Sequence, residues 1–289
     1  MTAESIPTTR FTSQWSLRRW GLLAALVLCE ILVASVLRSQ RAATDLLLVV
    51  EFVGVAAVAG ALAYASARSF DAGQTARRAW LFIALMPLGD ALTLMSYIIP
   101  NLLGKSESKG PLVAAATTVI SLSRILVAVA FFMMIRVYRK SGLSLKLQVR
   151  DYAAMIVLGA MGVGAALMSN VISWSTGGER LHRIAFFFGT PMIIALIPCS
   201  IFGVILWRYA ACMGGGLVAK AWRNVLLYGV VWVTYLLTTG LTTYIPRPIP
   251  SEYFFVFYVI RWLLIGSQYF IFLGASYQYE ACNSALEFE

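Results

Sequence analysis

Long blocks of apolar residues, separated by short polar segments, run through the whole chain. Each block holds about 20 residues, the length of helix that crosses the hydrocarbon core of a bilayer. Helices are expected because a spanning segment must satisfy every backbone polar group without water. In chain order the predicted spans are Trp20–Leu37, Leu46–Ala67, Ala79–Ile99, Val113–Tyr138, Tyr152–Trp174, Ile184–Tyr209, Trp222–Ile245 and Phe254–Tyr277. The pattern therefore predicts an all-α, polytopic membrane helix bundle of about eight transmembrane helices over residues 20–279, with tails at residues 1–19 and 280–289.

Composition and charge support a membrane protein. The 289 residues are 60% hydrophobic and only 12% charged, and a soluble domain would carry about twice that charged fraction. The net charge of +10 does not indicate nucleic acid, because the basic residues fall in short loops, where they contact anionic lipid headgroups. About twice as many Lys and Arg flank the spans on the N-terminal side as on the other. This asymmetry predicts an inner-membrane protein with both tails in the cytoplasm and the lipid bilayer as its partner.

Five tryptophans fall near the ends of the predicted spans, which is typical of indoles at the headgroup level of a bilayer. They are Trp20, Trp80, Trp174, Trp207 and Trp222.

Two stretches of sequence suggest an internal duplication. Residues 79–100 begin with Ala-Trp and end with Tyr-Ile-Ile-Pro, and residues 221–246 begin with Ala-Trp and end with Tyr-Ile-Pro. Each stretch is followed by a span that carries one arginine away from its ends, Arg124 in the first case and Arg261 in the second. The pattern predicts two parallel four-helix repeats, residues 1–150 and 151–289, related by an axis along the membrane normal. A chance resemblance between apolar helices is the alternative.

Five charged residues lie well inside the predicted spans, away from their ends: Glu30, Glu51, Asp90, Arg124 and Arg261. A charge at the bilayer centre costs about 3 kcal/mol on insertion scales, so each needs a partner or a polar cavity. Asp90 and Arg124 lie near mid-depth on consecutive antiparallel spans, which permits an ion pair. Glu51 and Arg261 both lie toward the outer half of the bilayer, which permits a second. For Glu30, burial favours a neutral, hydrogen-bonded carboxyl, and a proton relay is the alternative.

The two ion pairs have two interpretations. They are either staples that fix the register between helices, or parts of a polar cavity between the two halves. In the second case Arg124 and Arg261 are available to an anionic headgroup, a carboxylate or a quinone-like ligand.

Few groups offer cofactor or catalytic chemistry. His182, the only histidine, falls in a short outer loop. There it is either an edge ligand to one pigment or metal, or a simple interfacial residue. No lysine lies within a predicted span, so no retinal Schiff base is expected. The sequence has no Walker A, HExxH or GxSxG motif and no CxxC pair, and we therefore expect neither a metal centre nor an enzyme.

Three short motifs carry a resemblance. Arg77–Trp80 reads Arg-Arg-Ala-Trp, Leu88–Leu92 reads Leu-Gly-Asp-Ala-Leu, and Ser121–Arg124 reads Ser-Leu-Ser-Arg. They resemble the multi-span N-terminal membrane input domains of bacterial diguanylate cyclases and sensor kinases, in which an acid often stands where this chain has Arg124. The resemblance implies a sensory module that acts through membrane or cytoplasmic signalling partners.

The last residues, Leu286–Glu289, are typical of a truncation or cloning junction. The question whether a further C-terminal domain follows is therefore open.

Three functions fit these observations, in descending order. The first is a non-enzymatic sensory or small-ligand-binding membrane module. The second is a structural subunit of a larger membrane complex, for example a bioenergetic one. The third is a small transporter, which the predicted repeats and the prolines within the spans would suit.

Overall fold

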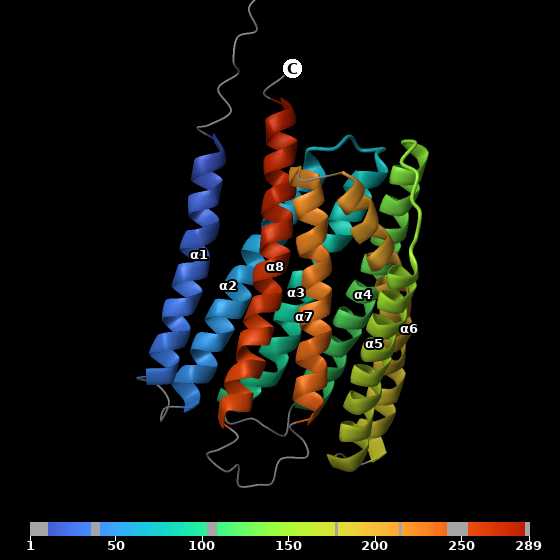
Figure 1. Ribbon diagram of the computed structural model, residues 1–289. Helices are drawn as coiled ribbons and strands as arrows, with labels where there is room; N and C mark the ends of the chain where they lie inside the picture. Colours follow the sequence, from blue (N-terminus) through green and yellow to red (C-terminus); the bar gives the residue numbers. More distant parts are fainter. Residues whose placement is uncertain are drawn as a thin grey trace, which may run out of the picture. The chain divides into compact units, whose positions relative to one another are not determined.

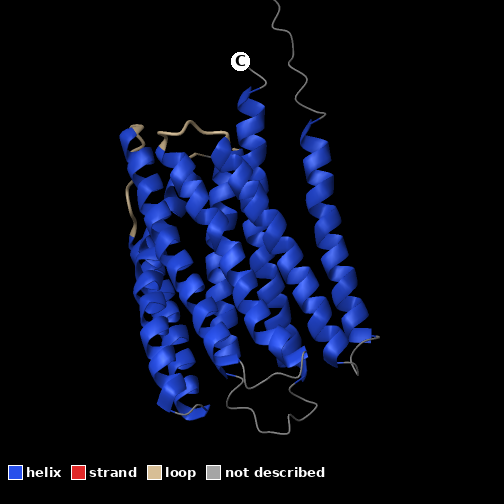
Figure 2. Ribbon diagram, turned by 180° about the vertical axis from the view of Figure 1, so that it is seen from behind, coloured by secondary structure: helices blue, strands red, loops and turns tan. Residues whose placement is uncertain are grey.

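The described residues of the computed structural model form a set of helices, as Figures 1 and 2 show. The structure describes the backbone of residues 11–35, 41–102, 109–176, 179–213, 216–241 and 254–286. It describes the side chains of residues 17–33, 35, 43–96, 99, 115–116, 118–165, 167, 195–213, 216–239 and 256–284. Within these ranges the helices are α1 (Phe11–Ser35), α2 (Arg41–Arg68), α3 (Thr75–Leu102), α4 (Lys109–Lys140), α5 (Val149–Thr176), α6 (Glu179–Cys212), α7 (Leu217–Leu241) and α8 (Phe254–Leu286).

The all-α prediction is confirmed for the described residues, and each predicted span overlaps one helix. Five stretches are long and apolar enough to cross a membrane: Ala43–Arg68, Thr75–Ser96, Thr118–Lys140, Ala195–Cys212 and Val256–Ser284. The described parts of α1, α5 and α7 contain no such stretch. In α7 Lys220 and Arg223 interrupt the apolar run, and in α1 and α5 the continuous described side chains cover only residues 17–33 and 149–165, too few for a full span. The described residues therefore support five spans rather than about eight.

The chain divides into two compact units, Met1–Leu47 and Leu48–Glu289. The first unit contains α1 and the start of α2. The second contains the rest of α2 and all of α3 to α8. Within it the main contacts join α3 to α4, α5 to α6 and α7 to α8, and α4 also packs on α6. Figure 1 shows α3 to α8 side by side with roughly aligned axes. The duplication into residues 1–150 and 151–289 stays a prediction.

The polarity of α4 is the reverse of that of a helix in a soluble protein. Large apolar side chains are exposed along one face of the helix, three or four residues apart: Leu122, Ile125, Val129 and Phe132. The polar side chains of Ser123 and Arg124 are buried instead, each with 3% of its surface exposed. An apolar exterior around a polar interior suits a lipid environment, where every polar group must find a partner inside the bundle.

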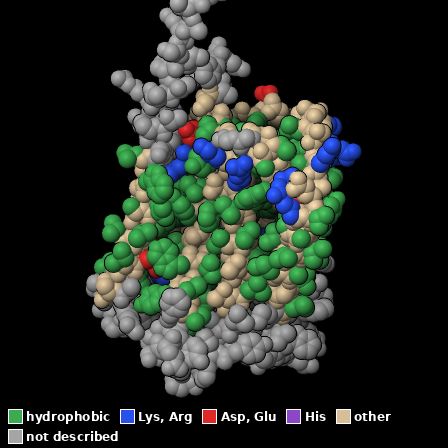
Figure 3. Space-filling view, viewed as in Figure 1, with side chains coloured by type: hydrophobic (Ala, Val, Ile, Leu, Met, Phe, Trp, Pro, Cys, Tyr) green, Lys and Arg blue, Asp and Glu red, His purple; other side chains and the backbone are tan. Residues whose placement is uncertain are grey.

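Basic side chains are grouped at one end of the second unit. Arg77 and Arg78 stand at the start of α3, and Arg139 and Lys140 at the end of α4. Because successive helices run in opposite directions, these positions lie at the same end. Figure 3 shows Lys and Arg gathered toward one end of the visible face, with hydrophobic side chains over its middle.

Close packing of α7 against α8 depends on Gly274. A methyl group at this position would stand 2.7 Å from Val225 Cγ2 and 3.1 Å from the carbonyl oxygen of Ala221. Valine has a stiff side chain, so the helices would have to separate. We expect Gly274→Ala to lower the free energy of unfolding by about 1–3 kcal/mol.

Gly266, on the same helix, is the matched control, because a methyl group there would meet nothing within 4 Å. Alanine is the better helix former, so Gly266→Ala should leave stability unchanged or raise it by up to about 1 kcal/mol. Reversible unfolding in mixed detergent micelles measures both variants. Equal losses in the two variants would contradict this account of the α7–α8 interface.

Candidate functional site

A buried polar cluster centred on Asp90 joins four helices of the second unit. Arg124 Nη2 on α4 donates to Asp90 Oδ1 at 2.5 Å. The Tyr228 hydroxyl on α7 and Gln268 Nε2 on α8 both donate to Oδ2, the amide at 2.9 Å. None of the four residues has more than 3% of its surface exposed. The carboxylate of Asp90 on α3 is therefore held by one cation and two neutral donors.

Local packing places these groups opposite one another. A methyl group on Gly89 would stand 3.1 Å from the hydroxyl oxygen of Ser123, so glycine allows α3 and α4 to approach closely beside the ion pair. The guanidinium carbon of Arg124 lies 4.1 Å from the ring centroid of Trp232 and 5.2 Å from that of Tyr228. Aromatic rings stabilise a cation more strongly where water is excluded, so the two rings add to the support from Asp90.

The second ion pair joins α8 to α2. Arg261 Nη2 lies 2.8 Å from Glu51 Oε2, with 10% of the arginine side chain and 4% of the glutamate side chain exposed. Both ion pairs that the sequence permitted are thus present in the structure. They differ in their surroundings, because Arg124 lines the cavity described next and Arg261 is not among its lining residues.

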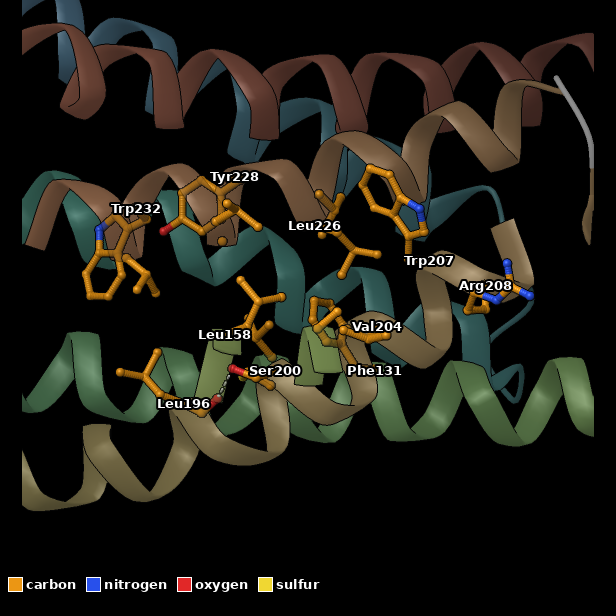
Figure 4. A pocket seen from close by; sticks show the side chains of 18 of the residues that line it. Phe131, Leu158, Leu196, Ser200, Val204, Trp207, Arg208, Leu226, Tyr228 and Trp232 are labelled. Atoms are coloured by element: carbon orange, nitrogen blue, oxygen red, sulfur yellow. Dashed lines mark hydrogen bonds between the residues drawn. The ribbon is translucent and has the colours of Figure 1, made fainter. Parts of the chain in front are cut away.

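A cavity of about 580 Å³ lies among α4, α5, α6 and α7, with Met86 of α3 also in its lining. Its volume is within the range of small-molecule sites, roughly 300–1,000 Å³. Figure 4 shows that Tyr228 and Trp232 lie at one end, Trp207 and Arg208 at the other, and apolar side chains such as Val204 between them. The cavity is therefore elongated, with an aromatic end and a charged end.

The aromatic end of the cavity includes Arg124. Its Nε is buried and, among the described residues, has no hydrogen-bond partner. A buried donor without an acceptor is costly, so an acceptor on a bound molecule would find a ready partner here.

The charged end consists of Arg150 and Asp151 at the start of α5 and Arg208 near the end of α6. Asp151 Oδ2 accepts the backbone N–H of Gln148 at 2.7 Å, which caps the start of α5. The same oxygen lies 3.1 Å from Arg208 Nε. Arg150 is exposed. This end therefore has two guanidinium groups and one carboxylate.

Two predicted site residues stand outside this arrangement. Glu30 lies on α1 in the first unit, whereas the ion pairs and the cavity are built from the second unit alone. The side chain of His182 lies outside the described residues, so its predicted role as a single pigment or metal ligand stays a prediction. Among the residues that were described, no three or more His, Cys, Asp or Glu side chains lie together as a metal site would need.

Sequence reasoning missed several members of the site. Tyr228 and Gln268 are polar residues within predicted spans. A polar residue inside an apolar span is the only sequence feature that could have indicated their role. Arg150, Asp151 and Arg208 resemble ordinary charges at span ends.

The chain matches no known family model, no curated protein and no solved structure.

Proposed function

We propose that this chain is a non-enzymatic integral membrane module that binds a small lipophilic ligand inside its helix bundle and serves a sensory role. The observation that carries the proposal is the cavity of about 580 Å³ that reaches from the buried Arg124 to the Arg208 end. Small-molecule sites combine mostly apolar walls with a few polar groups that set the orientation of the ligand, and this cavity has that composition.

Arg124 can serve both as a staple and as part of a ligand site. Its Nη2 is bonded to Asp90, which compensates the buried charge and holds α3 to α4. Its Nε remains available beside the cavity. The proposal therefore joins the two interpretations of the Asp90–Arg124 pair. For the Glu51–Arg261 pair we propose a stapling role only, because neither residue lines the cavity.

We further propose that all eight helices span the bacterial inner membrane, with both tails in the cytoplasm. The shortest helices, α1 and α7, have 25 residues. At 1.5 Å per residue each is about 37 Å long, enough to cross a hydrocarbon core of about 30 Å. The basic ends of α3 and α4 would then face the cytoplasm. A sensory role implies a membrane or cytoplasmic signalling partner that responds to the occupied cavity.

Filling the cavity tests the proposed function. Ala154 on α5 lines the cavity, whereas the neighbouring Ala153 is exposed and does not. We expect wild-type protein, extracted gently from its own membrane, to carry a stoichiometric small molecule in native mass spectrometry. Ala154→Phe should lower the affinity for that molecule roughly 5- to 150-fold, because overpacking costs about 1–3 kcal/mol.

Ala153→Phe is the matched control and should retain the ligand. Absorption spectra of the same samples would reveal a pigment. Wild-type protein that carries stoichiometric partner subunits and no small molecule would instead favour a structural subunit of a larger complex. Substrate flux in proteoliposomes would favour a transporter.

A further inference from the structure

We infer that the ligand is a single-chain anionic amphiphile, whose headgroup binds at Arg150 and Arg208 and whose apolar chain runs through the cavity toward Trp232. The inference rests on the proposed ligand-binding function and adds the chemical class and orientation of the ligand. It follows from the charge at the two ends of the cavity and from the apolar walls between them.

At the aromatic end an anion is disfavoured. Arg124 is already paired with Asp90, so this end carries one positive and one negative buried charge. A second carboxylate or a phosphate would leave an uncompensated negative charge close to Asp90, in a region of low dielectric where like charges repel strongly. The remaining donor, Arg124 Nε, suits a neutral hydrogen-bond acceptor on the ligand rather than an anion.

At the charged end an anion is favoured. Asp151 is occupied, since its Oδ2 accepts the Gln148 backbone N–H and lies 3.1 Å from Arg208 Nε. Within the described part of the chain, no carboxylate forms an ion pair with Arg150. Two guanidinium groups against one carboxylate leave one positive charge in surplus, and guanidinium matches carboxylate and phosphate oxygens geometrically.

The walls between the two ends suit an apolar chain. Leu158, Phe131, Val204 and Leu226 occupy this stretch in Figure 4. The hydroxyl of Ser200, also in this stretch, already donates to the carbonyl of Leu196 at 2.8 Å. An apolar chain that enters here displaces few polar contacts. It also moves apolar surface out of water into an apolar environment, which the hydrophobic effect favours.

Position-specific quenching tests the orientation. Trp207 and Trp232 stand at opposite ends of the cavity. Stearate carrying a nitroxide quencher near its carboxylate should quench Trp207, and stearate with the quencher near its methyl end should quench Trp232. Trp207→Phe and Trp232→Phe assign each signal in purified protein held in non-ionic detergent. Quenching in the reverse order would place the headgroup at Arg124 and overturn the inferred orientation.

Charge specificity tests the ligand class. Hexadecanoate and hexadecyl phosphate should bind at least about tenfold more tightly than hexadecanol, and Arg150→Gln should remove that advantage without affecting hexadecanol. Lys146→Gln removes an exposed positive charge from the loop before α5, away from the cavity lining, and should change nothing. The tighter of the two anions identifies whether the source is a free carboxylic acid or a phosphate monoester.

The failure of this inference differs from the failure of the proposed function. Equal binding of hexadecanol and hexadecanoate, or an Arg150→Gln variant that still prefers the anions, would overturn the inference and leave a lipophilic site standing. If none of the three amphiphiles bound and neither nitroxide-labelled stearate quenched a tryptophan, the ligand-binding function itself would fail.

Discussion

Replacing Arg124 with leucine should lower the free energy of unfolding by about 3–5 kcal/mol, because the Asp90 carboxylate would stay buried without its cation. The effect should be large because both side chains are almost fully buried, with 4% of the arginine and 2% of the aspartate side chain exposed. Tyr228 and Gln268 would remain as donors to Asp90, but two neutral groups do not compensate a charge. SDS-induced unfolding in mixed detergent micelles measures the loss.

Two variants test the cause of this loss. Asp90→Asn combined with Arg124→Leu removes both charges and should recover most of the stability, since replacing both partners of a buried pair is often nearly neutral. Arg136→Leu removes an exposed arginine from the same helix and should change stability by about 0.5 kcal/mol or less. A double variant as unstable as Arg124→Leu alone would show that the uncompensated charge is not the cause.

Replacing Trp222 with alanine should lower the free energy of unfolding by about 3–5 kcal/mol, because it would empty a large site in the core. Trp222 is 0% exposed, and its ring centroid lies 5.4 Å from that of Trp80 and 6.1 Å from that of Phe131. Its indole N–H donates to the Tyr138 hydroxyl at 2.6 Å. The alanine variant loses the packing and the hydrogen bond together.

Trp262 provides the matched control, since its side chain on α8 is 42% exposed. Trp262→Ala should change stability by about 0.5 kcal/mol or less. Trp222→Phe keeps most of the ring packing and should fall between the two, because it loses chiefly the bond to Tyr138. Similar losses in Trp222→Ala and Trp262→Ala would mean that the interface around Trp222 does not stabilise the bundle.

The contact between Trp80 and Trp222 also corrects an expectation. Both lie near the ends of predicted spans, where an indole usually faces the lipid headgroups, yet they are 1% and 0% exposed. The interfacial interpretation is wrong for these two. Depth in the bilayer follows from position along a span, whereas the direction that a side chain faces depends on how the helix is rotated against its neighbours.

The sequence by itself determined the helices and permitted the two ion pairs. A block of about 20 apolar residues specifies a helix locally, because in lipid each segment must satisfy its own backbone. The pairing of Asp90 with Arg124 and of Glu51 with Arg261 followed from similar depths on their spans and from the cost of a buried charge. Both properties depend only on position along the chain and on the type of residue.

Only the tertiary structure decided which helices surround Asp90 and where the cavity lies. Tyr228 and Gln268 reach the carboxylate from α7 and α8 because of helix rotation and neighbour choice, which no short pattern encodes. The cavity is space that five packed helices, α3 to α7, leave unfilled, so no single residue signals it. For the same reason only the tertiary structure distinguishes the two arginines, which both lie within apolar spans. Arg124 lines the cavity, and Arg261 is not among its lining residues.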